Sequence, residues 1–174
     1  MYTLKREHES FRLVSFLDEE VVLETSDKGV AETFLEATSI VSQLAPELES
    51  SLYLDGGDNC ACDEFGDIWI NPQFVLEIQE VTGMSLDLLL EIVVSHELGH
   101  AFLLEAEADS WNEVAAWLIG ERLFLRLGKE ADLEYFRGIQ EALLPTYESD
   151  EHYKSWFIEA EEEASKGLSL LKAW

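Results

Sequence analysis

Cysteine and proline are scarce in this chain of 174 residues, and each scarcity excludes a type of protein. The two cysteines, Cys60 and Cys62, are too few and too close together for a disulfide framework. A structural zinc site usually needs four ligands, and their neighbourhood does not supply the other two. We therefore predict two reduced thiols in a loop. The three prolines and ten glycines form no linker-like run, which favours a single domain over residues 1–174.

Positive charge is also scarce, because 11 Lys and Arg residues stand against 37 Asp and Glu residues and the net charge is −26. Contacts to nucleic-acid phosphates need Lys and Arg, so this balance argues against a nucleic-acid partner. The acidic residues are spread along the whole chain, and we expect most of them on solvated faces. The charge is compatible with a basic partner.

No hydrophobic run is long enough to cross a bilayer. The most apolar stretch, residues 86–94, is interrupted by Asp87 and Glu91 and is far too short to span a membrane. The first residues, MYTLKREHESFRLVSF, contain neither the apolar segment nor the cleavage site of a signal peptide. We therefore expect a soluble, cytoplasmic protein, and the hydrophobic content of 47% is typical of a globular one.

Strands are predicted before residue 71 and helices after it, which indicates the α+β class. The runs FRLVSFL, EEVVLET and SLYL favour strands, and the alternation in DIWINP predicts a half-buried strand at about 67–71. Helical spacing of apolar residues covers about 29–44, with Pro46 after it. Asn71-Pro72 starts another helix, which Gly83 ends. Further helices are predicted at about 86–104, 110–127, 130–144 and 149–171.

The helix over about 86–104 is apolar on almost every side, so it belongs in the middle of a domain. It carries HELGH, which places His96, Glu97 and His100 in an H-E-x-x-H motif. Residues four apart share a helix face, so both imidazoles can bind one zinc ion. Glu97 can then act as the general base on a zinc-activated water. The alternative is a pair of hydrogen-bonded helix histidines, but burying them with Glu97 and no metal would cost free energy.

A catalytic zinc ion usually has three protein ligands, so one more is expected after His100. The candidates are the carboxylates that follow: Glu105, Glu107, Asp109 and Glu113. If the helix continues, Glu107 lies about 10 Å along the axis from His100 and cannot reach back, and Glu105 points to a different face. A second, antiparallel helix that begins at Asp109 or Ser110 avoids this problem. We predict Glu113 as the third ligand; its alternative role is in a capping box with Ser110.

These motifs resemble the core of gluzincin metallopeptidases, in the compact form of minigluzincins and ImmA/IrrE-type proteins. In these families an edge strand precedes the H-E-x-x-H helix, and a following helix supplies a glutamate in an E-x-x-A setting. DIWINP, at about 67–71, resembles the edge strand, and Glu113-Val-Ala-Ala116-Trp117 resembles the glutamate motif. EAEAD at 105–109 also matches E-x-x-A, and the spacing from His100 to Glu113 is short for the group.

The resemblance covers residues 67–117 and implies a compact zincin-like domain that hydrolyses peptide bonds in a protein or peptide. It also implies that His96, His100 and Glu113 bind Zn2+ and that Glu97 is the catalytic base. Acidic cleft walls would favour basic substrates.

A metallopeptidase also needs a hydrogen-bond donor for the oxyanion that forms during the reaction. His152 and Tyr153 are the one His–Tyr pair far from the motif, although a solvated helix start is the preferred interpretation of this segment. Two other functions are compatible with the sequence: a latent proenzyme, and a non-enzymatic acidic binding or inhibitor protein with structural zinc. The intact Glu97 favours catalysis, because a structural zinc site has no use for a base.

Overall fold

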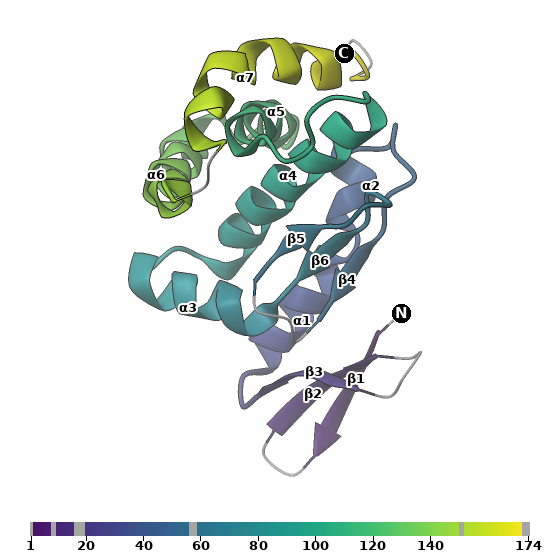
Figure 1. The fold of residues 1–174 in the computed structure, drawn as a ribbon. Helices are drawn as coiled ribbons and strands as arrows, with labels where there is room; N and C mark the ends of the chain where they lie inside the picture. Colours follow the sequence, from purple (N-terminus) through teal and green to yellow (C-terminus); the bar gives the residue numbers. More distant parts are fainter. Residues whose placement is uncertain (1, 8–9, 16–19, 56–58, 150–151, 172–174) are drawn as a thin grey trace.

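The computed structural model describes residues 2–7, 10–15, 20–55, 59–149 and 152–171. It confirms the α+β class, with strands in the N-terminal part and helices in the C-terminal half (Figure 1). The first sheet is antiparallel and has the order β1-β2-β3, built from β1 (Tyr2–Glu7), β2 (Ser10–Ser15) and β3 (Val21–Thr25). The strand pair expected at 11–25 is therefore present, with residues 16–19 outside the described part. The pattern did not predict β1.

The second sheet has the order β4-β6-β5, from β4 (Leu52–Leu54), β5 (Ala61–Cys62) and β6 (Ile68–Ile70). β6 is parallel to β4 and antiparallel to β5. The expectation of an edge strand at about 67–71 is therefore wrong, because β6 is paired on both sides and lies in the centre. The edge strands are β4 and β5, and β5 lies in the segment that we predicted as a loop. Two paired residues are too short to show the alternation that identifies a strand.

The other edge of this sheet is partly covered by the N-terminal sheet. The Tyr2 hydroxyl accepts a hydrogen bond from the Leu54 N–H at 2.6 Å and donates one to the Leu54 carbonyl at 3.0 Å. These backbone groups point away from β6, since the next residue, Asp55, donates its N–H to Ile70. Tyr2 therefore occupies an outward edge position of β4 that would otherwise be open to another chain.

The helix expected at 29–44 is divided into α1 (Lys28–Ala37) and α2 (Ile40–Leu44). Between them the Thr38 and Ser39 hydroxyls donate to the carbonyls of Leu35 and Glu36, both at 2.8 Å. Such side-chain bonds compete with the helical pattern and explain the break. The next helix agrees with the prediction, because α3 (Pro72–Thr82) is capped by Asn71 and ends at Gly83.

The central helix is α4 (Leu86–Glu105), capped by Ser85 as predicted. Figure 1 shows it between the sheet β4-β6-β5 and the C-terminal helices, and the fully buried Ile68 and Ile70 of β6 belong to the same core. On its other side lies α5 (Glu113–Leu125), at close range. A Cβ atom at Gly99 would lie 2.2 Å from the Ala116 carbonyl oxygen, so the two backbones touch there.

The remaining helices cover α5. They are η1 (Glu130–Asp132), α6 (Leu133–Leu143), η2 (Leu144–Tyr147) and α7 (Tyr153–Leu168). The last helix starts at Tyr153 and not at residue 149 as predicted; a 3-10 turn that contains Pro145 follows α6, and residues 150–151 lie outside the described part. Among the helices that the structure describes, none has the length and hydrophobicity needed to cross a membrane.

Candidate metal centre

The buried middle of α4 carries the three residues of the H-E-x-x-H motif. His96 and Glu97 are each only 6% exposed, and His100 is partly buried. One ligand atom from each of these residues lies within 4.8 Å of the other two. The prediction that this spacing gathers the three side chains at one point is confirmed.

Glu113, the first residue of α5, reaches the same point. Its Oε2 lies 3.2 Å from His96 Nε2 and 3.6 Å from His100 Nε2, and the two Nε2 atoms are 3.3 Å apart. In a tetrahedral zinc site with bonds of 2.0–2.1 Å, neighbouring ligand atoms are about 3.3–3.4 Å apart. The triangle of donor atoms therefore has the size of one face of such a site, and two imidazoles with one carboxylate suit zinc.

The chain reverses between His100 and Glu113, as the predicted antiparallel helix requires, in a turn whose position the sequence did not reveal. Glu107 has a positive φ of 52°, and its N–H and that of Ala108 donate to carbonyls at the end of α4. A left-handed residue at this place ends the helix abruptly and closes the turn. The short spacing is therefore sufficient to bring the start of α5 back to His100.

The alternative ligands lie elsewhere. Glu105 ends α4 and Glu107 lies in the turn. Asp109 accepts a hydrogen bond from the Trp111 N–H at 3.1 Å. None of these three is among the described residues that line the cleft above the histidines.

The capping box, which was the alternative role for Glu113, is absent, because Asn112 caps α5 and neither Asp109 nor Ser110 does. The Asn112 Oδ1 accepts from the Ala115 N–H at 3.0 Å. Ser110 contributes differently, since its carbonyl accepts from His100 Nδ1 at 2.7 Å. This bond orients the imidazole with Nε2 towards the centre, as partners of metal-binding histidines do. His96 is oriented by stacking on Trp117, with ring centroids 4.0 Å apart.

The electrostatics of the centre favour a cation. Burial would lower the pKa of His100, but the hydrogen bond and charge of Glu113, and the charge of Glu97, raise it to about 9. Burial would raise the pKa of Glu113, but hydrogen bonds and charges of His100 and His96 hold this pKa far below its ordinary value. Glu113 Oε2 is buried, and its close polar neighbours among the described residues are the two Nε2 atoms at 3.2 and 3.6 Å, in a geometry too poor for full hydrogen bonds. A metal cation would neutralise this carboxylate.

Glu97 has a different environment from Glu113. Burial raises its pKa, and the charges of His96 and His100 oppose this rise only in part. The backbone N–H of Cys62 in β5 also interacts with its carboxylate and favours the charged form. Two neighbouring carboxylates thus have pKa values shifted in opposite directions, a pattern typical of separate acid–base and ligand roles.

A cleft of about 920 Å3 opens above these residues. Its walls come from β5 and the following turn on one side, and from Ser110, Trp111 and Tyr147 on the other. Tyr147, at the end of η2, was not identified from the sequence. Burial, followed by the charges of Glu113 and Glu97, raises its pKa, so its hydroxyl stays protonated. His152 and Tyr153 do not line the cleft; they lie at the start of α7, which was the preferred interpretation.

Comparison with protein-family models, with curated proteins and with solved structures finds no match to this chain. The interpretation of the centre therefore depends on the residues and distances described above. The strongest of these observations is the joint position of the two imidazoles and the two carboxylates under one cleft.

Proposed function

We propose that this chain is a zinc-dependent metallopeptidase of the zincin type, which hydrolyses peptide bonds in a protein or peptide. The observation that carries the proposal is the triangle of His96 Nε2, His100 Nε2 and Glu113 Oε2, with sides of 3.2 to 3.6 Å. These three residues would hold the ion. When bound, zinc would lower the pKa of a coordinated water towards about 7 and polarise a carbonyl oxygen.

Glu97 is the group that we assign to proton transfer. Its carboxylate would take a proton from the attacking water and then pass it to the nitrogen of the leaving amine. A raised pKa suits this task, because a group that both accepts and donates a proton works best with a pKa near the working pH. The Cys62 backbone N–H holds the carboxylate from the side of the cleft formed by β5.

Tyr147 supplies the hydrogen-bond donor that His152 and Tyr153 do not. Tyr147 lines the cleft, and its hydroxyl interacts with Glu113 and keeps its proton because its pKa is raised, primarily by burial. We assign it to the stabilisation of the negative oxygen that develops when water attacks the carbonyl. In the free protein the Glu113 carboxylate keeps this O–H near the centre.

The outer edge of β5 gives an extended peptide a place to bind. β5 pairs with β6 on one side, and Asp63 directs its N–H towards the Asp67 carbonyl in the same pairing. The backbone groups of Cys62 therefore face the opposite way, towards the cleft and Glu97. A substrate strand that lies along this edge would add to the sheet and bring its own carbonyl beside the centre.

The proposal is tested by incubating zinc-loaded protein with a mixture of unfolded proteins and identifying new chain ends by mass spectrometry. Wild type should cleave, and Glu97→Gln should lose at least about 100-fold in rate while it retains its zinc. A zinc-loaded wild type that cleaves nothing, or an equally active Glu97→Gln, would overturn the proposal. A zinc-loaded wild type that binds a protein or peptide but cleaves nothing would favour the alternative, an acidic binding protein with structural zinc.

A further inference from the structure

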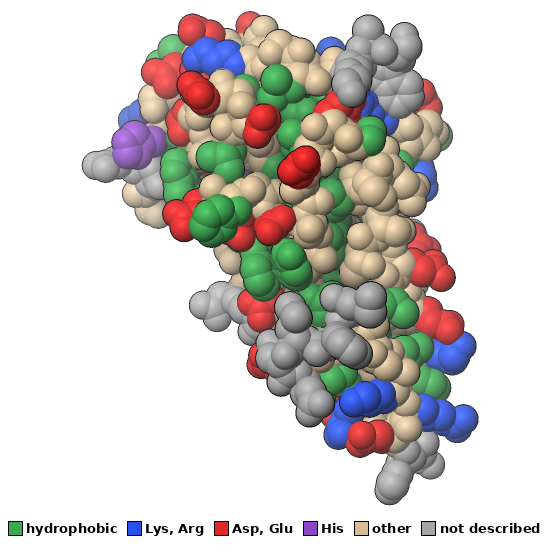
Figure 2. Space-filling model, turned by 90° about the vertical axis from the view of Figure 1, so that its right-hand side faces the viewer, with side chains coloured by type: hydrophobic (Ala, Val, Ile, Leu, Met, Phe, Trp, Pro, Cys, Tyr) green, Lys and Arg blue, Asp and Glu red, His purple; other side chains and the backbone are tan. Residues whose placement is uncertain are grey.

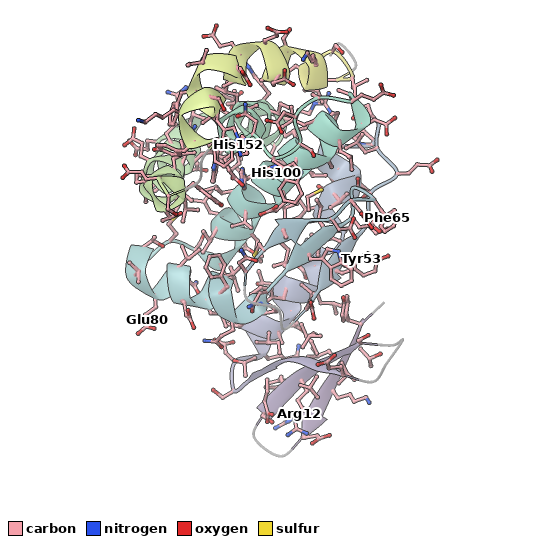
Figure 3. The ribbon with its side chains drawn as sticks, in the orientation of Figure 1. Arg12, Tyr53, Phe65, Glu80, His100 and His152 are labelled. Atoms are coloured by element: carbon pink, nitrogen blue, oxygen red, sulfur yellow. The ribbon has the colours of Figure 1, made fainter. Side chains whose placement is uncertain are left out.

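Three aromatic side chains besides Tyr147 line the cleft, and we call Phe65, Trp69 and Trp111 the aromatic rim. Phe65 follows β5, Trp69 belongs to β6, and Trp111 precedes α5. Phe65 is 78% exposed and Trp111 is 80% exposed. Figure 3 shows Phe65 on the same side of the molecule as Tyr53 of β4, whereas Glu80 of α3 lies on the opposite side. The rim therefore combines large apolar surface with access to solvent.

The aromatic rim stands on fixed backbone. The Asp63 carboxylate accepts hydrogen bonds from the Phe65 N–H at 2.9 Å, the Asp67 N–H at 3.0 Å and Trp69 Nε1 at 2.9 Å. Trp69 also stacks on Tyr53, with ring centroids 4.8 Å apart. One carboxylate thus fixes two members of the rim, and their exposure is not the result of a loosely held turn.

Trp111 is fixed from both sides along the chain. Its N–H donates to Asp109 Oδ1 at 3.1 Å, Ser110 before it holds His100, and Asn112 after it caps α5. Exposed aromatic side chains on rigid backbone lose little conformational entropy on binding and are typical anchors of binding sites. The two most exposed members of the rim thus frame the candidate metal centre from opposite walls of the cleft.

Apart from the two histidines of the metal centre, the charged residues of the cleft are all acidic. Four of the described residues that line it are acidic and none is Lys or Arg. Glu97 and Glu113 face the metal centre, which leaves Asp63 and the exposed Glu64 beside the aromatic rim. Figure 2 shows hydrophobic and acidic side chains in the middle of the face that carries β4-β6-β5, and Lys and Arg towards both the lower end, where β1-β2-β3 lies, and the upper end. The net charge of −26 adds a general attraction for cations to that of Asp63 and Glu64.

We infer that the cleft is specific for an extended peptide segment in which a bulky apolar side chain, aromatic or long aliphatic, is flanked by Lys or Arg. The apolar side chain would bind between Phe65 and Trp111, and the basic residues would lie beside Glu64 and Asp63. Basic residues also gain from the aromatic rings themselves, since cations bind the faces of Trp and Phe. Cleavage of such a segment rests on the proposed function, whereas its binding does not.

Binding is measured with zinc-loaded Glu97→Gln protein, which keeps the cleft but should not consume the peptide. Four synthetic peptides of equal length, each with a fluorescent label, combine a central Phe or Ala with Lys or Glu flanks. Fluorescence anisotropy should show the tightest binding for Phe with Lys flanks. Adding Phe65→Ala or Trp111→Ala should weaken the Phe peptides by about five- to thirtyfold and the Ala peptides much less, since these lose at most the contact of a basic residue with the ring.

Two matched variants serve as controls. Phe157→Ala removes an aromatic side chain of α7 that is 51% exposed and does not line the cleft, and it should have no effect. Glu64→Lys should weaken the Lys-flanked peptides about threefold or more at low salt, whereas Glu80→Lys on α3 changes the charge equally and should leave the preference intact.

Equal affinity for the four peptides would overturn the inference, as would a Phe157→Ala effect as large as that of Trp111→Ala. The outcomes are separate from those of the proposed function. Selective binding by Glu97→Gln without any cleavage by wild type would leave the inference standing and refute the peptidase. Zinc-dependent cleavage with no preference among the four peptides would support the peptidase and refute the inference about specificity.

Discussion

Gly99 is the position where one added methyl group should most disturb the candidate metal centre. It lies between Glu97 and His100 on α4, where the backbone of α5 passes directly over it. A Cβ atom at Gly99 would lie 2.2 Å from the Ala116 carbonyl oxygen, 2.8 Å from its carbon and 2.9 Å from its Cα. Ordinary van der Waals contact begins at 3.4 Å. Because all three atoms belong to the backbone, no side chain can move aside.

The Gly99→Ala variant therefore requires α5 to move away from α4 by about 1 Å, since the interior is close-packed. Glu113 is on the same helix, one turn before Ala116, and would move with it. Metal sites tolerate ligand displacements of about 0.2 Å, so zinc should be lost. Overpacking of this kind costs about 2–3 kcal/mol of unfolding free energy, and in a chain of 174 residues this lowers Tm by about 4–12 °C.

Thermal unfolding and zinc content are measured on Gly99→Ala beside Gly138→Ala. Gly138 lies within α6, and a Cβ atom there would meet nothing within 4 Å. That control should raise stability by about 0.5–1 kcal/mol, because alanine is the better helix former. If Gly99→Ala kept the Tm and the zinc content of wild type, the contact between α4 and α5 would not position Glu113, and the reasoning would be refuted.

Four further predictions follow from other contacts. Arg126→Met should lower the free energy of unfolding in urea by about 3–5 kcal/mol, because it leaves the Glu47 carboxylate buried without its bidentate partner. The double variant Arg126→Met, Glu47→Met should recover part of this loss, and no recovery would refute the prediction. Tyr147→Phe should lower kcat by about 100- to 1,000-fold and leave KM and zinc content unchanged. An unchanged kcat would show that Tyr147 has no part in the reaction. Removal of zinc by a chelator should lower Tm, and zinc at 100 times its Kd should restore about 2.7 kcal/mol, whereas an unchanged Tm would speak against a specific site. In the metal-free protein, the raised pKa of His100 stabilises the fold fully below pH 6.5, and this stabilisation is lost as the pH rises through about 9. The free energy of unfolding, measured in urea, should therefore fall over this pH range in wild type and not in Glu113→Gln. The same fall in both proteins would contradict the pairing of His100 with Glu113.

The helical part of the fold could be predicted from the sequence where its local signals were complete. α3 has an Asn-Pro start and a Gly end, and α4 has a serine cap and a continuous apolar run, so both were predicted to within a residue or two. α1 and α2 were predicted as one helix, since the hydroxyl bonds of Thr38 and Ser39 decide the break and apolar spacing does not report them. The start of α5 was placed too early, because Asp109, Ser110 and Asn112 all have side chains that can cap.

The sheet could be predicted from the sequence only in part. A strand pattern at 67–71 indicates β6 but does not say which strands pair with it, so its position in the centre depends on contacts with β4 and β5. β5 has two paired residues, too few for any alternation, yet it forms the wall of the cleft beside Glu97.

The site shows the same division between local and long-range information. His96, Glu97 and His100 lie within one turn of one helix, so their spacing alone predicted that they meet. Glu113 was reached by excluding residues that a continuing helix would carry away, and the turn at Glu107 makes that argument valid. Tyr147 has no such local signature, because η2 reaches the cleft only through the packing of α6 and α7 on the rest of the molecule.

The central claim is that His96, His100 and Glu113 form one zinc site, and metal content per chain tests it most directly. Wild type, Glu113→Gln and Glu105→Gln are purified side by side, loaded with zinc, freed of excess metal and measured by elemental analysis. The account predicts close to one zinc per chain in wild type and Glu105→Gln and a clear loss in Glu113→Gln. Wild type without zinc after loading, or full zinc retention in Glu113→Gln, would contradict it.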